Sequence, residues 1–453
     1  MEAGIKMKKL FTFMLVCALL MVALPALADN VRTSGPYTYE IKGNGTITIT
    51  AFDWSQNEGD IFIPNMIDGY TVTAIGDSAF AEKYVKSVAV NIPDSVKSIG
   101  KFAFKDTGIR EINIHNNLQM IGDGAFIGCD CQFKISPNHS KFAVIGSALY
   151  NKPQKELIAY YGEVNTFTIP EGILSIAPYA LYENHTLNIV FPSTLKTIGD
   201  YALYSVFIKL PKLYDIPMSG AAPVGNLLPD GLQSIGDYAF ANAGFYGYNS
   251  QTNPAIYIPS SVETIGVSAF RAAKVYNIHN YLSIYIGADS ALRHIPQDAF
   301  RHADAYIEIR CPITSIGDYA FSDITSNINW GSVYIDKFAD VSSIGEGAFY
   351  LKSYSTSSKR NGGGGFPSQI TTVPKLFNVV TTLPNTVEAI PSQAYTFAVK
   401  DYYLPASVEE IATDAFPKGS SFVVEAGSYA EFWCSENGFG YTIEGQDALD
   451  WLN

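Results

Sequence analysis

Apolar and polar positions alternate over short stretches of the chain and then change to a wider spacing. Residues 256–259 show the alternating part, which predicts a short strand with one buried face. Pro259 ends this strand because proline has no N–H to donate to a ladder. Four apolar residues then follow at spacings of three, four and one: Val262, Ile265, Ala269 and Phe270. Their spacing predicts a tight turn and a short helical piece with its apolar side inward.

This change of period recurs from residue 75 to residue 416, in twelve copies keyed on an Ile with Ala four residues later. The copies begin at Ile75, Ile99, Ile121, Ile176, Ile198, Ile235, Ile265, Ile295, Ile316, Ile344, Ile390 and Ile411. A degenerate thirteenth copy lies at 145–149, and uninterrupted copies are 21 to 24 residues apart. A repeat of this length predicts a solenoid, in which stacked coils bury a face that one coil cannot bury alone.

The letters of the repeat suggest a role for each position. Gly, as at Gly266, is expected to supply backbone freedom at the bend. Asp often follows it, as at Asp77, Asp200 and Asp318, and is expected to cap the first N–H groups of its own helical turn. Ala is expected where one coil meets the next, and Phe is expected to fill the space between coils.

The stretch from Pro93 to Phe104, with Ile92 before it, follows the pattern I-P-x-S-V-x-x-I-G-x-x-A-F. This pattern resembles the BspA-like subfamily of leucine-rich repeats, also known from treponemal surface proteins. Residues 135–160 resemble the divergent coil of that family, and 424–431 with 436–438 resemble its C-terminal capping strand. The resemblance covers roughly 37–445. It implies a leucine-rich repeat solenoid with a parallel β-strand and a short helical or irregular segment in each coil, capped at both ends. It implies little about the ligand.

The first 28 residues have the features of a secretory signal peptide. Lys6, Lys8 and Lys9 precede an apolar run from Leu10 to Leu24, and 26–28 read Ala-Leu-Ala. No later apolar stretch reaches 18 residues, so no membrane span is expected. The sequence therefore predicts an exported protein, secreted or associated with the cell surface.

The remaining chain divides into a cap, a solenoid and a second cap. Residues 29–62 are predicted as an N-terminal β-hairpin cap, because two alternating runs, 37–41 and 46–50, flank an Asn-Gly turn. Residues 63–420 are predicted as the solenoid, and 421–453 as the C-terminal cap. Three insertions, near 212–226, 242–253 and 352–369, are predicted to form surface loops.

Charge and cysteine content exclude some classes of function. The formal net charge is −13, and removal of a segment with three Lys and one Glu changes it to −15. An acidic chain without a basic cluster is a poor binder of nucleic acid. Four cysteines remain after residue 28, and they are expected to be isolated thiols or to form at most one bridge: Cys129, Cys131, Cys311 and Cys434.

Catalytic and metal-binding patterns are missing from the sequence. The six histidines show no metal-ligand spacing, and no G-x-S-x-G nucleophile motif occurs. The glycine run 362–365 lacks the Lys-Ser/Thr of a phosphate-binding loop. Acidic residues recur once in each repeat, whereas a catalytic pair is expected at a singular place. We therefore expect no enzymatic activity, no cofactor and no metal.

The outward-facing strand positions are the candidate binding surface. They are Asn91, Asn113, Thr168, Val190, Lys209, Tyr257, Tyr285, Glu308, Tyr334, Thr382 and Tyr403. Tyr257, Tyr285, Tyr334 and Tyr403, with Glu308, are predicted to form an exposed ladder with broad contact area. The alternative is that Tyr is simply a good strand former.

The leading hypothesis is an adhesin-like binding protein that engages a protein ligand of a host or a neighbouring cell. The alternative is a glycan-binding module that uses the same Tyr ladder. Nothing in the sequence sets the oligomeric state.

Overall fold

Two compact units make up the computed structural model. Unit 1 holds residues up to 153 together with 158–162, and unit 2 holds 154–157 and the residues from 163 onward. The structure describes residues 30–56, 59–81, 88–129, 131–162, 166–184, 188–211, 226–247, 254–275, 282–324, 333–336, 340–350, 382–396 and 402–445. The predicted signal peptide, the insertion 352–369 and most of the insertion 212–226 lie outside these residues.

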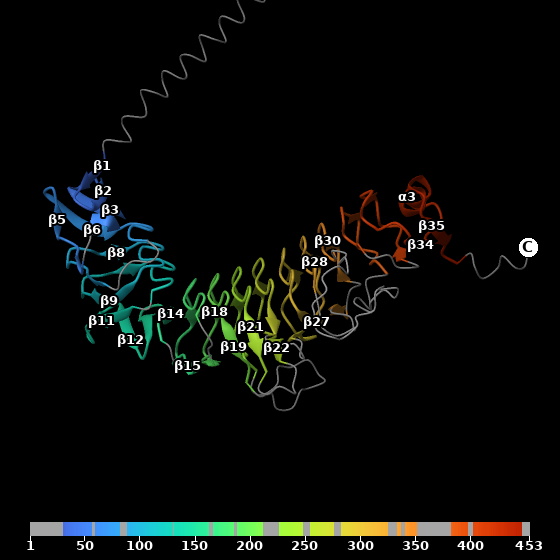
Figure 1. The fold of residues 1–453 in the computed structure, drawn as a ribbon. Helices are drawn as coiled ribbons and strands as arrows, with labels where there is room; N and C mark the ends of the chain where they lie inside the picture. The colour runs from blue at the N-terminus through green and yellow to red at the C-terminus, as the bar shows by residue number, and fades with distance from the viewer. Residues whose placement is uncertain are drawn as a thin grey trace, which may run out of the picture. The chain divides into compact units, whose positions relative to one another are not determined.

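Unit 1 begins with antiparallel strands and continues with parallel ones (Figure 1). Strands β1 (Val31–Ser34), β2 (Tyr37–Ile41) and β3 (Thr46–Phe52) pair antiparallel, so the predicted hairpin is present, with β1 as an additional outer strand. The sheet then continues in parallel through β6 (Tyr70–Ile75), β8 (Ser98–Ile99) and β10 (Met120–Ile121). Strand β5 (Met66–Ile67) pairs antiparallel with β6.

A second sheet of unit 1 contains one strand from each coil. Strands β4 (Ile61–Phe62), β7 (Val88–Asn91), β9 (Ile109–Ile114) and β11 (Gln132–Ile135) pair in parallel. A short 3₁₀ helix, η1 (Trp54–Gln56), precedes them. Strands β12 (Phe142–Ile145) and β13 (Ala148–Asn151) form an antiparallel hairpin in the predicted divergent coil.

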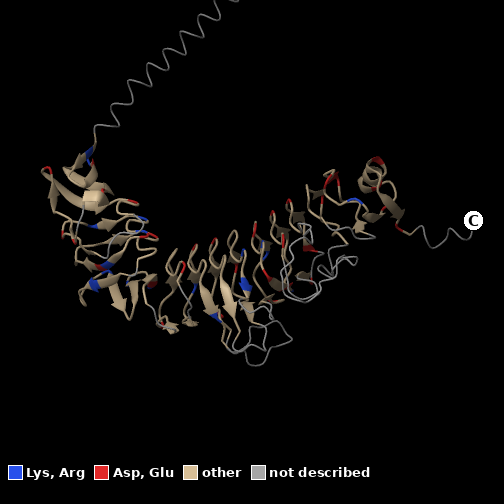
Figure 2. Cartoon of the chain, in the orientation of Figure 1, with Lys and Arg blue, Asp and Glu red and all other residues tan. Residues whose placement is uncertain are grey.

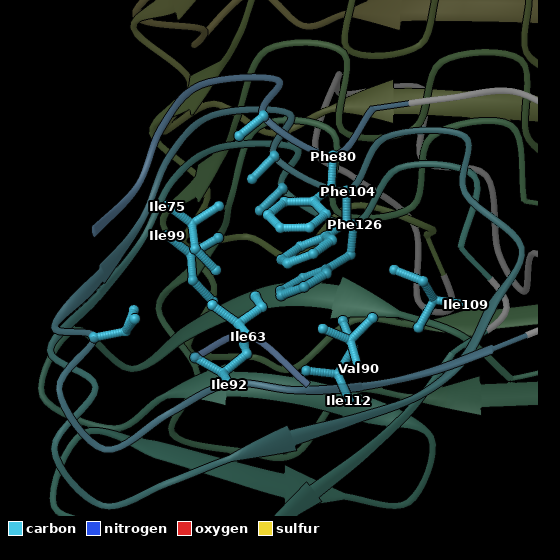
Figure 3. Close-up of a cluster of buried hydrophobic side chains, with 14 of the residues drawn as sticks. Ile63, Ile75, Phe80, Val90, Ile92, Ile99, Phe104, Ile109, Ile112 and Phe126 are labelled. Carbon is cyan, nitrogen blue, oxygen red and sulfur yellow. The ribbon is translucent and has the colours of Figure 1, made fainter. Parts of the chain in front are cut away.

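Equivalent residues of successive coils stack in the core of unit 1 (Figure 3). The ring centroids of Phe80 and Phe104 are 5.2 Å apart, and those of Phe104 and Phe126 are 5.8 Å apart. Ile75 and Ile99 pack beside this column, and both are buried. The expectation that Phe fills the space between coils is confirmed, because each ring covers the ring of the preceding coil.

In unit 2 the repeated Ile pairs with the Ile of the next coil. Residues Glu156 and Leu157 of β14 (Glu156–Tyr160) pair with β16 (Ser175–Ile176), which continues to β18 (Thr197–Ile198), β20 (Ser234–Ile235) and β23 (Thr264–Ile265). The same parallel pairing joins β26 (His294–Ile295), β28 (Ser315–Ile316) and β30 (Ser343–Ile344). It also joins β31 (Ala389–Ile390) to β33 (Glu410–Ile411).

The other strands of unit 2 form four parallel groups. They are β15 (Thr166–Thr168) with β17 (Asn188–Val190); β19 (Phe207–Lys209) with β21 (Gly244–Tyr246) and β24 (Lys274–Val275); β22 (Ala255–Ile258) with β25 (Leu282–Ile286), β27 (Ala305–Ile309) and β29 (Val333–Ile335); and β32 (Tyr402–Leu404) with β34 (Ser421–Val424) and β35 (Gly440–Ile443).

The prediction of a surface loop over 242–253 is wrong in its first part, because 244–246 form β21 and Phe245 is buried.

The segment after each repeated Ile is a pair of turns rather than a short helix. Among the described residues, eight of the twelve segments contain two residues with positive φ, for example Tyr201 (55°) and Ser205 (58°). Their N–H groups donate to the next coil, with Tyr201 N to Asp237 O at 2.8 Å and Ser205 N to Ala241 O at 2.9 Å. This second ladder of hydrogen bonds offsets the cost of the left-handed backbone. The fold is therefore a parallel β-solenoid with little helix.

The predicted roles of the repeated Asp and Gly are both wrong. Asp237 does not cap its own turn, because its Oδ1 accepts a hydrogen bond from the N–H of Val267 in the next coil, at 2.7 Å. Gly266 does not have positive φ; in its turn that conformation belongs to Ser268, at 56°. A Cβ on Gly266 would come within 3.0 Å of the backbone nitrogen of Asp237. Gly is therefore needed for the close approach of two coils.

The predicted C-terminal capping strand is mainly a helix. Helix α3 (Tyr429–Asn437) lies between β34 and β35. The side chain of Ser428 accepts a hydrogen bond from the N–H of Glu431, and Glu431 Oε2 accepts one from the N–H of Gly427, which is close to a capping box. Gly438 ends the helix in the left-handed conformation, with φ of 73°. Among the described residues, no helix is long and apolar enough to cross a membrane.

The four cysteines of the described residues form no disulfide bond, and all four are buried. The hydroxyl of Thr107 and the thiol of Cys129 are 3.0 Å apart, and the thiol also donates to Phe104 O. Hydrogen bonding to Cys131 lowers the pKa of the Cys129 thiol. Burial raises the pKa of the Cys434 thiol to about 12, so this thiol stays protonated.

Candidate functional site on the strand face

Four of the five predicted site residues lie in register on adjacent strands. Tyr257 of β22 is opposite Tyr285 of β25, which is opposite Glu308 of β27, which is opposite Tyr334 of β29. Side chains at matched positions of parallel strands share one face of a sheet. These four residues are called the strand face below. Tyr403 lies on a different sheet, on β32, in register with Val423.

The prediction that these side chains form an exposed ladder is wrong at two positions. Tyr257 is only 4% exposed and Glu308 only 8%, whereas Tyr285, Tyr334 and Tyr403 are half-buried. The rings of Tyr257 and Tyr285 stack with centroids 4.7 Å apart. Lys209 pairs with Tyr246 of β21. The side chain of Asn226 bonds to both the backbone N–H and the carbonyl oxygen of Tyr257.

Glu308 is at the centre of a charged cluster on this face. Its Oε1 accepts a hydrogen bond from Nε of Arg310, and its Oε2 accepts one from the hydroxyl of Tyr306 at 3.1 Å. The ring of Tyr306 meets that of Tyr285 edge to face, with centroids 6.2 Å apart. A carboxylate this buried needs such partners, because an unpaired buried charge is strongly unfavourable.

The phenols of this region are held in the neutral form. Burial raises the pKa of Tyr257 to about 12, and it also raises that of Tyr306, where the charge of Glu308 adds to it. The hydrogen bond to Asp336 raises the pKa of Tyr334, whose hydroxyl donates to Asp336 Oδ1 at 3.0 Å. These hydroxyls therefore act as hydrogen-bond donors at neutral pH.

Tyr403 has a similar arrangement on its own sheet. Its hydroxyl donates to Glu444 Oε2 at 2.9 Å and lies 3.4 Å from Glu425 Oε1. Burial, with the hydrogen bond to Glu444, raises its pKa to about 12. Tyr334 and Tyr403 thus share a pattern in which a carboxylate fixes the hydroxyl and the ring stays half-buried.

The arrangement of these tyrosines suits the binding of a partner through direct side-chain contacts. It offers aromatic rings in fixed positions and hydroxyls that are neutral and already oriented. Among the described residues, no three His, Cys, Asp or Glu side chains gather closely enough to hold a metal ion.

A comparison with models of known protein families found a match over much of this solenoid. Residues 45–157, 154–217 and 226–356 match the model of the BspA type leucine rich repeat region, and these stretches cover more than half of the chain. The chain belongs to the BspA-type leucine-rich repeat family. The resemblance carried by the motif from Pro93 to Phe104 is thereby confirmed. No curated protein matches this BspA-type chain.

Several solved structures are similar to this chain. A leucine-rich cell surface protein of Faecalibacterium prausnitzii is 18% identical, with 93% of this chain and 96% of that chain covered and a TM-score of 0.38. A leucine-rich repeat protein of Bacteroides ovatus is 18% identical, with 91% and 99% covered and a TM-score of 0.40. The pneumococcal vaccine antigen PcpA is 13% identical, with 91% and 98% covered and a TM-score of 0.31.

A second group of tyrosines in this BspA-type chain was not predicted from the sequence. Five of them lie in the turns of three coils, and their rings stack: Tyr179, Tyr182, Tyr201, Tyr204 and Tyr238. The signal was present, because Tyr directly precedes the repeated Ala at 179, 201 and 238, in three successive full copies of the motif. These tyrosines lie in the turns, outside the strand positions from which a binding surface was predicted.

Proposed function

We propose that this chain is an adhesin-like binding protein of the cell surface that engages a protein ligand through its repeat surface. The observation that carries the proposal is the strand face, on which Tyr285 and Tyr334 flank the buried Glu308 in strict register. Tyrosines that are fixed before binding lose little conformational entropy when a partner covers them. Stacked coils extend such a surface over many strands.

Three further features support this function. The predicted signal peptide directs the chain out of the cell. The similar protein of Faecalibacterium prausnitzii is described as a cell surface protein. The half-buried rings of Tyr285 and Tyr334 offer contact area, and the neutral phenol of Tyr334 and the paired Glu308 supply no activated nucleophile. We therefore propose binding, with no catalysis, as the activity of the exported chain.

A glycan-binding module is the second candidate function. It is favoured by the half-buried rings of Tyr285 and Tyr334, because sugars pack against aromatic side chains. The burial of Tyr257 counts against it, since the ring that would extend this platform is only 4% exposed. We rank protein binding first for this reason.

The test is binding of the chain from residue 29 onward to matched panels of extracellular-matrix proteins and glycans. A triple variant, Tyr285→Ser with Tyr334→Ser and Tyr403→Ser, removes the accessible rings. A matched variant with Phe at the same three positions keeps the rings and removes the hydroxyls. We expect saturable binding to a protein, at least about tenfold weaker in the Ser variant and less affected in the Phe variant.

Binding to glycans alone would favour the second candidate function. Protein binding that the Ser variant leaves unchanged would exclude the strand face as the site. Absence of binding to either panel would contradict the proposed function. Circular dichroism of each variant checks that the strands remain folded.

A further inference from the structure

A group of stacked tyrosines lies in the turns of unit 2. We call Tyr179, Tyr182, Tyr201, Tyr204 and Tyr238 the tyrosine edge. Tyr179, Tyr201 and Tyr238 form one row, with centroids 5.0 and 4.6 Å apart and ring planes within 8° and 7° of parallel. Tyr182 and Tyr204 form a second row, with centroids 5.0 Å apart at 6°. The rows meet at 5.9 and 5.7 Å, so the five rings form one continuous array.

The fold does not require tyrosine in the first row. Each of its members has left-handed backbone, with φ of 64° at Tyr179, 55° at Tyr201 and 54° at Tyr238. This conformation costs an ordinary residue about 1–2 kcal/mol and favours Gly, Asn or Asp. In other coils this position holds a small or turn-favouring residue at Ser78, Gly124, Ser268, Asp298 and Gly347, and a bulky or long side chain occurs only singly, at Phe102, Tyr319 and Gln393. Three bulky rings in succession therefore point to a role other than folding.

The tyrosine edge is held in place before any partner arrives. All five rings are half-buried, so each is partly accessible to solvent. The amide of Asn242 donates a hydrogen bond to the hydroxyl of Tyr204 at 2.7 Å. Burial raises the pKa of Tyr201, and the neighbouring phenols add to that shift, so its hydroxyl is neutral at physiological pH. Because the rings stack face to face, a partner meets their edges and hydroxyl groups.

The charge beside these rings is negative. Asp200, Asp237 and Glu183 are exposed in the same turns. The described turns at 177–184, 199–206 and 236–243 contain no Lys or Arg. Acidic positions recur along the turns of unit 2 in Figure 2. A partner with basic residues matches this charge, and complementary charge mainly adds specificity and speed of association.

We propose that the tyrosine edge is a docking surface for a protein partner that presents a segment with Lys or Arg side chains. The rings supply contact area, and the carboxylates of Asp200, Asp237 and Glu183 accept hydrogen bonds from the basic groups. This site is separate from the strand face, since it lies in the turns and not on β22, β25, β27 or β29. The inference rests on the proposed function, because it assumes that the chain binds proteins.

The experiment uses a displayed library of random 12-residue peptides, selected on the chain from residue 29 onward. We expect selected peptides to be rich in Lys and Arg and to bind more weakly as salt increases. The test variant carries Tyr179→Asn, Tyr201→Asn and Tyr238→Asn, because Asn tolerates the left-handed backbone. Its dissociation constants should be at least about tenfold higher than those of the parent chain.

The matched control is Tyr319→Asn. Tyr319 occupies the same turn position with φ of 53°, but its ring lies under Arg301 at 4.9 Å and its hydroxyl donates to Glu346 at 2.6 Å. Binding by this variant should stay within about twofold of the parent chain, since the residue is outside the tyrosine edge. Equal loss in the control and the test variant would show a general effect on the turns and would overturn the proposal.

Other outcomes separate this proposal from the proposed function. Basic peptides that still bind the triple Asn variant but no longer bind the variant with Ser at 285, 334 and 403 would overturn the tyrosine edge and leave protein binding standing. Selected peptides without a basic bias, or a library without binders, would also overturn it. Glycan binding that the triple Asn variant abolishes would assign the surface to another class of ligand and overturn it as well.

Discussion

The carboxylate of Asp237 accepts a hydrogen bond from the backbone N–H of Val267, 2.7 Å away and one coil further along the solenoid. Three other pairs have the same geometry at 2.7 to 2.8 Å: Asp77 with Lys101, Asp200 with Asp237, and Asp318 with Glu346. The repeated Asp therefore joins neighbouring coils instead of stabilising its own turn. Each bond satisfies an N–H beside the point where the Gly of one coil approaches the backbone of another.

The first prediction concerns Asp237. Asp237→Ala leaves the N–H of Val267 without its protein acceptor and should lower the free energy of unfolding by about 1 kcal/mol. Asp237→Asn keeps an acceptor oxygen and should cost less than half of that. Urea unfolding measures both values, and hydrogen exchange of the peptide around Val267 reports the local effect. Equal protection of that amide in all three proteins would show that the bond contributes nothing.

The second prediction concerns the glycine of the same contact. Gly266→Ala would bring a Cβ within 3.0 Å of the backbone nitrogen of Asp237, where no flexible side chain can yield. The coils must move apart, so the loss should be about 2 kcal/mol or more, larger than that of Asp237→Ala. Gly440→Ala is the matched control, because no atom lies within 4 Å of its Cβ position and its φ is ordinary. A similar melting temperature for both variants would contradict the close-approach role.

The coil could be predicted from the sequence because its signals are local and repeated. Ile256 and Ile258 show the strand, Pro259 its end, and Ala269 with Phe270 the buried corner. The partner of each Asp could not be predicted, because a capping bond within the turn and a bond to the next coil require the same residue type. The helix α3 was missed although Ser428, Glu431 and Gly438 are a readable pair of helix caps.

The register of the strand face could be predicted, but the exposure of its side chains could not. Tyr257, Tyr285, Glu308 and Tyr334 align because each occupies the same place between two inward residues. Burial depends on what surrounds that place. Tyr257 is buried, and Glu308 is enclosed by Arg310 and Tyr306. The alternation of inward and outward residues along one strand predicts neither of these environments.

The third prediction tests the column of rings in unit 2. The ring of Phe300 stacks between those of Phe270 and Phe321, with centroids 5.7 and 5.6 Å away, and it is fully buried. Phe300→Ala should destabilise the protein by about 3–5 kcal/mol, because it leaves a cavity between two coils. Phe300→Leu should cost clearly less, since Leu181 and Leu203 occupy the same repeat position. Chemical denaturation gives both values, and equal losses would contradict a volume-filling role.

The fourth prediction is a loss of stability in mild acid through His139. This side chain is buried in unit 1, where its Nδ1 accepts hydrogen bonds from the N–H groups of Lys141 and Phe142, at 3.0 and 3.1 Å. Its Nε2 lies 2.9 Å from the carbonyl oxygen of His115 and therefore carries the proton. Protonation of Nδ1 would place its N–H against the N–H groups of Lys141 and Phe142, and both hydrogen bonds would be lost. Burial is the main factor that lowers the pKa of His139, and the charge of Lys152 adds to it.

Because the folded pKa of His139 lies below the unfolded value of about 6.5, the unfolded state binds more protons between the two values. Stability is therefore complete above about pH 6.5 and falls as the pH drops through that value toward the folded pKa. His139→Asn keeps an acceptor for the two N–H groups and does not titrate. Between pH 7.5 and 5.5 the free energy of unfolding of the parent chain should fall more than that of the variant. Equal losses would assign the acid sensitivity to other groups, of which His115 is the first to test, since burial lowers its pKa too.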